Sequence, residues 1–395
     1  MKPIVRAGRM KPVHSDIRGP LFVEAMKRQK QGIDILKLNT GNPATFGFGL
    51  PDSIKNALME HIQDGVGYCD FKGMPQARQA ICDYETSKGI KGITPDDVFI
   101  GNGVSEVVSF ALTPLLNDGD EVLVPSPSYS LWGNSVYLED GKPVFYTCDE
   151  QANWYPDIQD IRSKITDKTK AIVIINPNNP TGVLYPKEIL HEIIQIARES
   201  GLLIFADEIY DRLVMDGKQH ISLASLTEDV PVITLNGLSK SHCLCGYRCG
   251  WMVISGPREL TEDYRQGIIQ LTSLRLCANT MAQIVIPAAL DDMDTPTSMV
   301  RPGGRIYEQR EATVRELEKI DGLSFVKNDA AFYVFPKLDV KKFNITNDKQ
   351  FAHDLLDATN ILLVPGSGFD WKDPDHFRIV MLPQADILSD AIRRM

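Results

Sequence analysis

The sequence lacks any long uninterrupted apolar run, which argues against a helix that crosses a membrane. The first ten residues carry charges without an apolar region behind them, so we expect no signal peptide. Basic residues are also fewer than acidic ones: 42 Lys and Arg against 52 Asp and Glu give a net charge of -10. Because phosphate binding needs a basic surface, we expect no nucleic-acid partner.

Cysteine is scarce as well, with seven residues scattered along the chain. An odd, scattered set suits free thiols in a reducing cytoplasm. Three of them, Cys243, Cys245 and Cys249, lie close together. They could form a metal site or be small buried fillers of a loop. We favour fillers and expect no metal, because no second paired cluster completes a common zinc spacing.

The 395 residues are 43% hydrophobic and 24% charged, which is typical of a globular protein of two or three domains. Between about 101 and 287, short apolar runs alternate with helical patterns such as 187–198. Nearly continuous apolar strands joined by helices predict an α/β unit with a mainly parallel sheet covered on both faces. The runs are 121–124, 143–146, 170–175, 202–206, 232–235 and 250–254.

The C-terminal part has a different pattern. A charged amphipathic helix is predicted at 304–318, followed by short strands at 331–335, 361–364 and 377–381, with a helix between the first two. This pattern indicates a smaller α+β domain at 288–395. We expect residues 1–45 to join it and residues 46–287 to form the large domain.

Four chemical groups follow the predicted strands of the large domain. Lys240 follows 232–235, Asp207 and Tyr210 follow 202–206, and Asn179 follows 170–175 in Asn-Pro-Asn-Asn-Pro-Thr-Gly. An amine, a carboxylate, a phenol and an amide in this order fit pyridoxal phosphate. The lysine forms a Schiff base, the acid keeps the ring nitrogen protonated, and the phenol and amide bind the 3-oxygen.

Each of these residues also has an ordinary explanation. A lone lysine is usually a solvated charge, an aspartate before a helix is a favoured cap, and a tyrosine packs in many cores. The Pro/Asn density around Asn179 is first of all a turn signal. The combination favours function, because a partly desolvated lysine at a strand end can act as a nucleophile.

The motif Gly-Asn-Gly-Val-Ser-Glu at 101–106 opens a helix predicted at 104–116. Glycines before a helix N-terminus suit a phosphate, which backbone N–H groups of Val104 and Ser105 would bind together with the Ser105 hydroxyl. Ser239 and Arg248 would complete this site. Gly-x-Gly alone is a weak signal, because any tight turn uses it and the full dinucleotide motif is missing.

Three further residues are candidates for ring and substrate contacts. Tyr129 follows another strand and could stack on the pyridine or pack in the core. Arg378 lies in an otherwise apolar strand, where an unpaired arginine is costly to bury, so we expect it to bind a substrate α-carboxylate. Gly41 could let the backbone approach the same carboxylate.

The ordered set of motifs resembles the fold-type I pyridoxal-phosphate aminotransferases of class I/II. It comprises Gly-Asn-Pro at 41–43, Tyr68 with Lys-Gly-Met-Pro-Gln-Ala-Arg at 72–78, the motifs at 176–182 and 207–210, and Ser-Lys with Gly-x-Arg at 239–248. The resemblance covers about 16 to 382. It implies an aspartate-aminotransferase-like fold with a mixed, mainly parallel seven-stranded sheet and a smaller domain.

Within this class, the segments 16–20, 101–106, 275–279 and 302–310 are similar to bacterial glutamate–pyruvate (alanine) aminotransferases. This implies Lys240 as the Schiff-base lysine, Gly41, Asn179 and Arg378 as amino-acid contacts, and a homodimer in which Tyr68 reaches the neighbour's cofactor phosphate. Ser15, Gly237 and His242 depart from the residues that relatives tend to have.

The expected activity is a ping-pong transamination of L-alanine and 2-oxoglutarate to pyruvate and L-glutamate through the Lys240 Schiff base and pyridoxamine phosphate. Arg18 is the candidate for the distal carboxylate of glutamate. Alternatives are transamination of another amino acid and a C–S β-lyase on the same fold. Two others are a non-catalytic binding protein and a nucleotide-binding α/β protein, which would be colourless.

Overall fold

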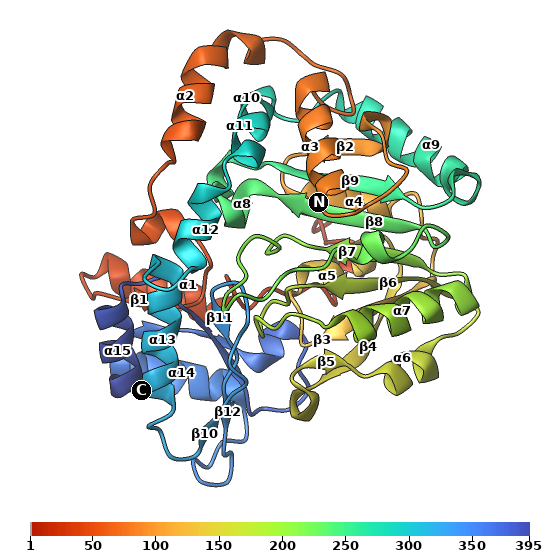
Figure 1. The fold of residues 1–395 in the computed structure, drawn as a ribbon. Coiled ribbons are helices and arrows are strands. Elements are labelled where there is room, and N and C mark those ends of the chain that lie inside the picture. The colour runs from red at the N-terminus through yellow and green to blue at the C-terminus, as the bar shows by residue number, and fades with distance from the viewer. Residues whose placement is uncertain (1) are drawn as a thin grey trace.

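The computed structural model describes residues 2–395. Within them, the largest sheet has eight strands and forms the centre of the molecule (Figure 1). Their order from edge to edge is β2 (Val98–Gly101), β9 (Gly250–Ser255), β8 (Val232–Gly237), β7 (Leu203–Asp207), β6 (Thr169–Ile175), β3 (Glu121–Ser126), β4 (Lys142–Asp149) and β5 (Tyr155–Pro156).

The sheet is mixed and mainly parallel, which confirms the predicted fold class. Strands β4, β3, β6, β7 and β8 pair in parallel, whereas β9 runs antiparallel to both β8 and β2. Six strands match the apolar runs of the sequence, and β2, which no predicted run covered, brings the number to the seven that the resemblance implied. The eighth, β5, is a two-residue strand that pairs antiparallel with the end of β4. Two residues are too few to show a strand period in the sequence, so this edge was not predicted.

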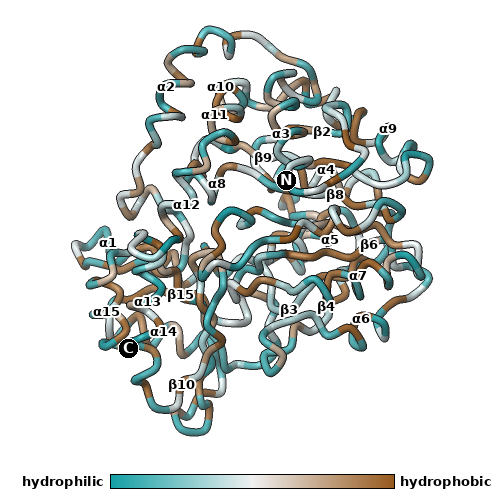
Figure 2. Tube along the Cα trace, viewed as in Figure 1, coloured by the Kyte–Doolittle hydropathy of each residue, from teal (hydrophilic) through white to brown (hydrophobic). Residues whose placement is uncertain are grey.

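Helices cover both faces of this sheet, and neighbouring residues of each strand enter different cores. Ile172 and Ile204 pack on one face with Ile193, while Val173 and Phe205 pack on the other. Figure 2 shows apolar segments concentrated in these strands. The helices are α3 (Pro75–Ser87), α4 (Val104–Leu112), α5 (Leu131–Leu138), α6 (Ile158–Lys164), α7 (Lys187–Ser200), α8 (Leu238–Ser241), α9 (Arg258–Arg275), α10 (Thr280–Ile284) and α11 (Ile286–Asp291).

Local sequence explains where two of these helices end. α7 matches its prediction and stops at Gly201, which adopts the left-handed conformation (φ 66°) that glycine tolerates best. α4 ends at Leu112, four residues earlier than predicted. Pro114 follows two residues later. It has no N–H to bond a carbonyl of the preceding turn, so the regular helix stops.

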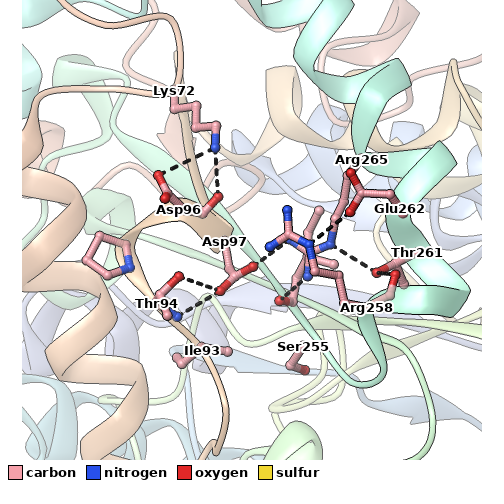
Figure 3. Close-up of polar contacts among 12 residues, drawn as sticks. Lys72, Ile93, Thr94, Asp96, Asp97, Ser255, Arg258, Thr261, Glu262 and Arg265 are labelled. Atoms are coloured by element: carbon pink, nitrogen blue, oxygen red, sulfur yellow. Dashed lines mark hydrogen bonds and ion pairs between the residues drawn. The ribbon is translucent and has the colours of Figure 1, made fainter.

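An ion pair fastens α9 to the edge strand β2 (Figure 3). Arg265 Nη1 donates to Asp97 Oδ1 at 2.6 Å, and both side chains are almost fully buried. The other oxygen of Asp97 accepts from the backbone N–H and the hydroxyl of Thr94, at 2.8 and 2.9 Å. Both carboxylate oxygens are therefore hydrogen-bonded, and the start of the edge strand β2 is held against α9.

The C-terminal residues build a smaller α+β unit, to which the N-terminal segment contributes. Strand β1 (Leu36–Lys37) pairs in parallel with β13 (Ile361–Leu362). Strand β15 (Phe377–Val380) pairs with both β11 (Tyr333–Val334) and β14 (Val364–Pro365). The strand predicted at 361–364 is thus two short strands with different partners. The remaining strands are β10 (Leu323–Ser324) and β12 (Lys337–Leu338).

The helices of this unit and of the connecting segments complete the fold. The helix predicted at 304–318 is present as α13. These helices are α1 (Pro20–Lys30), α2 (Asp52–His61), α12 (Asp294–Val300), α13 (Arg305–Leu317), α14 (Asp348–Thr359) and α15 (Ala385–Arg394).

No single helix within residues 2–395 is long and apolar enough to cross a membrane. α9 and the α10–α11 segment meet the length and composition criteria only as a pair, and the pair is bent by 119°.

Candidate active site

The predicted cofactor residues gather at one edge of the large sheet. β6, β7 and β8 are adjacent and parallel, so their carboxyl ends meet. Asn179 follows β6, Asp207 ends β7 with Tyr210 three residues on, and Lys240 lies in α8 directly after β8. The carboxyl end of a parallel sheet is where open α/β folds bind ligands.

Lys240 is half-buried, and its Nζ donates to the carbonyl of Gly41 at 3.0 Å. The ammonium also lies 5.9 Å from the centre of the Phe332 ring. Burial lowers the pKa of Lys240, but the acidic groups of Tyr333, Cys245 and Tyr129 raise it by more, so the net shift is upward. Lys240 is therefore held as an ammonium, opposite to the effect of desolvation alone.

Asp207 is buried at the end of β7, where its Oδ2 accepts from Trp132 Nε1 at 3.0 Å. Burial raises its pKa to about 6, although the Trp132 N–H opposes the shift. A buried carboxyl with a raised pKa gains most from a cationic partner. Trp132 was not predicted, because a tryptophan in an apolar helix gives no signal that its N–H faces an acid.

Tyr210 meets a second tyrosine that the sequence did not reveal. Its hydroxyl hydrogen-bonds the Tyr333 hydroxyl at 2.8 Å, and both side chains are buried. Burial raises the pKa of Tyr210 well above its ordinary value. Tyr333 lies in β11, 123 residues away in sequence, so only the tertiary fold brings the two phenols together.

Arg378 is buried in β15 and has no charged hydrogen-bond acceptor. Its Nη1 donates to Asn179 Oδ1 at 3.0 Å, its Nη2 donates to the Asn39 carbonyl, and its Nε bonds no group among residues 2–395. Burial lowers the pKa of Arg378. A buried guanidinium with neutral acceptors and a free N–H is suited to bind an anion.

Gly41 lies where any side chain would collide with the site. A Cβ there would lie 2.3 Å from the Tyr333 hydroxyl and 2.8 Å from the Phe332 ring. Its carbonyl accepts from Lys240, so the backbone of the N-terminal segment lies against the lysine. These contacts require glycine at this position, and the approach of its backbone to a substrate carboxylate stays a prediction.

The residues predicted to bind a phosphate also come together. α4 begins at Val104 and Ser105, directly after Gly103, whose φ of 84° favours glycine. The Arg248 guanidinium lies over this turn, because a Cβ on Gly103 would be 2.3 Å from Arg248 Nη2. Ser239 is half-buried, and its carbonyl accepts from the Cys245 thiol at 2.9 Å.

The other candidates lie in different surroundings. Tyr129 is half-buried and close enough to Lys240 and Arg378 to affect the pKa of both. Tyr68 is 84% exposed and bonds nothing in the site of its own chain. Arg18 is exposed on the N-terminal segment. The structure therefore brings Tyr129 to the site and leaves Tyr68 and Arg18 at the surface.

The residues that depart from the expected pattern have local explanations. A Cβ at Gly237 would lie 2.6 Å from the Cys249 carbonyl, so the backbone leaves no room for a serine. His242 is fully buried, and burial lowers its pKa to about 4. Ser15 is exposed.

The three clustered cysteines have separate contacts. Cys243 faces the sulfur of Met299, Cys245 faces the Ser239 carbonyl, and Cys249 is buried in the core.

The arrangement fits pyridoxal phosphate. Asp207 offers a buried carboxyl that a protonated ring nitrogen would satisfy, and Tyr210 and Asn179 offer groups for the 3-oxygen. The turn at Gly103 and Arg248 offers N–H donors and a cation for the phosphate. Lys240 lies near Arg378, whose positive charge opposes the net upward shift of the Lys240 pKa.

A family model for aminotransferases of class I and II matches residues 33–392. The chain belongs to this family, whose members depend on pyridoxal phosphate, and it is a transaminase.

Particular relatives are similar along their whole length. The chain is 50% identical over 395 residues to the glutamate-pyruvate aminotransferase AlaA of Haemophilus influenzae, covering 100% of this chain and 98% of that protein. It superposes on a crystal structure of an aminotransferase from Escherichia coli with a TM-score of 0.98 at 47% identity, covering 100% and 97%. An alanine aminotransferase from Pyrococcus furiosus gives a TM-score of 0.94 at 42% identity, covering 99% and 98%.

Proposed function

We propose that this transaminase interconverts L-alanine and 2-oxoglutarate with pyruvate and L-glutamate. The observation that carries the proposal is Arg378, a buried guanidinium whose hydrogen-bond acceptors among residues 2–395 are two neutral oxygens, those of Asn179 and the Asn39 backbone. An amino acid and a keto acid share the α-carboxylate that such a group binds. The names of the relatives at 42–50% identity, glutamate-pyruvate and alanine aminotransferase, support this substrate pair.

The α-carboxylate would lie against Arg378 and Asn179, with the backbone at Gly41 on the other side. When bound, pyridoxal phosphate supplies a carbonyl carbon that joins an amino group and a protonated ring that withdraws electrons from the neighbouring bonds. Lys240 would remove the proton from the substrate Cα and deliver it to the cofactor carbon, because its amine follows β8 at the same sheet edge as Asp207 and contacts the Gly41 backbone that would flank the substrate. Asp207 would keep the ring nitrogen protonated, and Tyr210 and Asn179 would bind the 3-oxygen.

The phosphate would bind at the N-terminus of α4, with Val104, Ser105, Ser239 and Arg248 as donors and Tyr129 against the ring. The turn at Gly103 supports this placement, because the Arg248 guanidinium already packs against it. A dianion at a helix N-terminus gains from the dipole and from the unpaired N–H groups.

The protein is proposed to be a homodimer in which Tyr68 reaches the phosphate of the partner. The support is exposed apolar area on two segments in contact: Val66, close to Tyr68 in sequence, is 80% exposed, and Leu274 and Leu276 are 82% and 52% exposed. Arg275, between the two leucines, donates to the Phe71 carbonyl at 3.2 Å. Exposed apolar patches on globular proteins commonly mark interfaces. We also place the protein in the cytoplasm, because its seven cysteines are free thiols.

The division into 1–45, 46–287 and 288–395 is likewise a proposal. The pairing of β1 with β13 supports it, because it attaches the N-terminal segment to the C-terminal unit. Arg18 remains the candidate for the distal carboxylate of glutamate. Arg18→Ala should raise the KM for glutamate and leave that for alanine; equal effects on both would contradict this assignment.

The test is an absorbance titration of the purified protein loaded with pyridoxal phosphate. L-Alanine alone should abolish the visible band, and 2-oxoglutarate should restore it. A yellow protein that alanine leaves unchanged would contradict the alanine assignment and keep the family. Pyruvate and ammonia formed from a cysteine conjugate without any keto acid would instead indicate the C–S β-lyase.

A further inference from the structure

A buried cluster of charges lies behind the segment that carries Asp207 and Tyr210. Lys88, the residue after α3, points its ammonium at three carboxylates. Its Nζ is 2.7 Å from Glu85 Oε2, 2.8 Å from Glu208 Oε2 and 3.1 Å from Asp211 Oδ2. The three acidic side chains are at most 3% exposed, and Lys88 is 13% exposed. Glu208 directly follows Asp207, and Asp211 directly follows Tyr210.

The cluster also holds the two neighbouring strand ends. Asp211 Oδ2 accepts from Asn236 Nδ2 at 2.7 Å, and Asn236 lies four residues before Lys240 at the end of β8. His220 Nε2 is 3.1 Å from the Asn176 carbonyl, just after β6, and 3.9 Å from Glu208. The segments that carry Asn179, Asp207 and Lys240 are therefore joined through one set of contacts.

The charges of the cluster are unequal, because one ammonium faces three carboxylates. Burial raises the pKa of Glu85 and so favours its protonated form. Burial also raises the pKa of Asp211, but the Lys88 ammonium outweighs it and keeps that pKa below its usual range. Glu208, Asp211 and His220 have ligand atoms close enough together to hold a metal ion. In this structure the Lys88 ammonium contacts both carboxylates and supplies the positive charge that a metal ion would bring.

We propose that Lys88 is a positioning residue of the transaminase: its ammonium pairs with both Glu208 and Asp211, offsets part of their negative charge, and so fixes the turn that presents Asp207 and Tyr210 to pyridoxal phosphate. The inference rests on the proposed roles of Asp207 and Tyr210. Lys88 itself does not touch the cofactor. Without its charge, two buried carboxylates repel each other next to the ring-nitrogen acid. The remaining donors to the two carboxylates, Ser222 and Leu223 on Glu208 and Tyr84 and Asn236 on Asp211, are neutral and do not remove this repulsion.

The experiment compares Lys88→Met with Lys91→Met, a matched change on an exposed lysine whose partner is the exposed Glu228. Three quantities are measured: the Kd of pyridoxal phosphate, the pH midpoint at which the visible band of the bound cofactor changes, and the thermal unfolding midpoint. Lys88→Met should weaken cofactor binding about tenfold, because a tenfold change in Kd corresponds to the loss of about one charge-assisted contact. The pH midpoint should rise by about half a unit, because uncompensated negative charge favours the protonated form. Lys91→Met should leave the Kd, the pH midpoint and the thermal unfolding midpoint unchanged.

A second variant separates charge from packing. Lys88→Met with Glu208→Gln removes one cation and one anion, so the net charge of the cluster is that of the wild type. The proposal expects this double variant to recover cofactor affinity and the pH midpoint, even if Lys88→Met alone folds poorly. A double variant no better than the single one, or a single variant within twofold of wild type with an unmoved midpoint, would overturn it.

The roles of Asp207 and Tyr210 are tested separately in the otherwise wild-type chain. If Asp207→Asn leaves cofactor affinity and the pH midpoint unchanged, the proposed role of Asp207 fails, whatever Lys88→Met does. If Asp207→Asn weakens binding while Lys88→Met does not, only the positioning role of Lys88 fails.

Discussion

Asp207 shows how a single residue prepares the site for a cation. Its only strong side-chain donor is the neutral Trp132 N–H, and burial brings its pKa to about 6. The cofactor-free protein therefore contains a carboxyl that ionises near neutral pH at a cost in stability. A protonated pyridine nitrogen would remove that cost, so part of the cofactor's affinity comes from relief of a buried charge.

This gives a pH-dependent prediction for the cofactor-free protein. The folded-state pKa of about 6 lies above the ordinary value of 3.8, so the folded state binds the proton more tightly. The associated stability is fully present below about pH 4 and is lost as pH rises through about 6. Asp207→Asn should remove this dependence and raise the free energy of unfolding at pH 8 by about 2–3 kcal/mol, at 1.36 kcal/mol per pKa unit. Urea unfolding at pH 5 and 8 measures it; a fixed difference between variant and wild type across this range would contradict the prediction.

Arg378 is the other residue whose surroundings anticipate a ligand. Its two bonded nitrogens contact amide oxygens, which leaves its positive charge uncompensated. A carboxylate would compensate this positive charge with its own negative charge and would offer two coplanar oxygen acceptors.

We expect Arg378→Lys to lower kcat/KM for L-alanine by roughly 10–100-fold, because a charge-assisted hydrogen bond contributes about 1.5–3 kcal/mol and lysine cannot form the two-pronged contact. Steady-state kinetics measure it. Arg315→Lys, on an exposed arginine of α13, is the control and should leave kcat/KM unchanged. Equal kinetics for the two variants would remove Arg378 from the substrate site.

At the scale of elements, the N-terminus of α4 depends on a glycine turn. Gly103 adopts a φ of 84°, and the Arg248 guanidinium occupies the space where a side chain would be. The turn therefore sets both the start of the helix and the position of the arginine.

Gly103→Ala should weaken pyridoxal phosphate binding at least tenfold and destabilise the protein by about 1 kcal/mol or more, because alanine is strained at this φ and displaces Arg248. Fluorescence titration and thermal unfolding measure the two effects. Gly246→Ala is the control in the same region, since a Cβ there meets nothing within 4 Å. Similar affinities for both variants would show that the turn does not hold the phosphate.

The sequence predicts these elements well where the period is regular and poorly where pairing is short. Apolar runs of four to six residues marked β3, β6, β7, β8 and β9, and the 3.6-residue pattern marked α7 and α13. The run 361–364 appeared as one strand, because its division between β13 and β14 depends on partners far away in the chain. β5 left no pattern because it has only two residues.

At the scale of the whole molecule, Tyr68 is the residue through which the proposed dimer can be tested. Its side chain is 84% exposed, and Val66, two residues before it, is 80% exposed. A hydroxyl that reaches a partner's phosphate would contribute one hydrogen bond to cofactor binding.

Tyr68→Phe should therefore raise the Kd of pyridoxal phosphate about three- to tenfold and leave the oligomeric state unchanged, since only the hydroxyl is lost. Cofactor titration and analytical ultracentrifugation measure these. Tyr137→Phe is a comparable loss of a partly exposed hydroxyl on α5 and should have no effect. A wild-type monomer at micromolar concentration would contradict the dimer itself.

The candidate site was predictable to the extent that each residue stands at a strand end. Lys240, Asp207 and Asn179 could be placed at one edge because parallel strands share their direction. Tyr333 and Trp132 could not, since their contacts join residues 123 and 75 positions apart. The Lys88 cluster was missed because a lysine at the end of a helix normally faces solvent.

The bond between Asn179 and Arg378 has a consequence for anyone who redesigns substrate choice by directed evolution. It joins the segment after β6 to β15 at 3.0 Å, so changes on either side of it will be epistatic. Libraries that vary Arg378 need to vary Asn179 together with it. Arg18 and Ser15 are exposed on the N-terminal segment, so substitutions there can be screened one at a time.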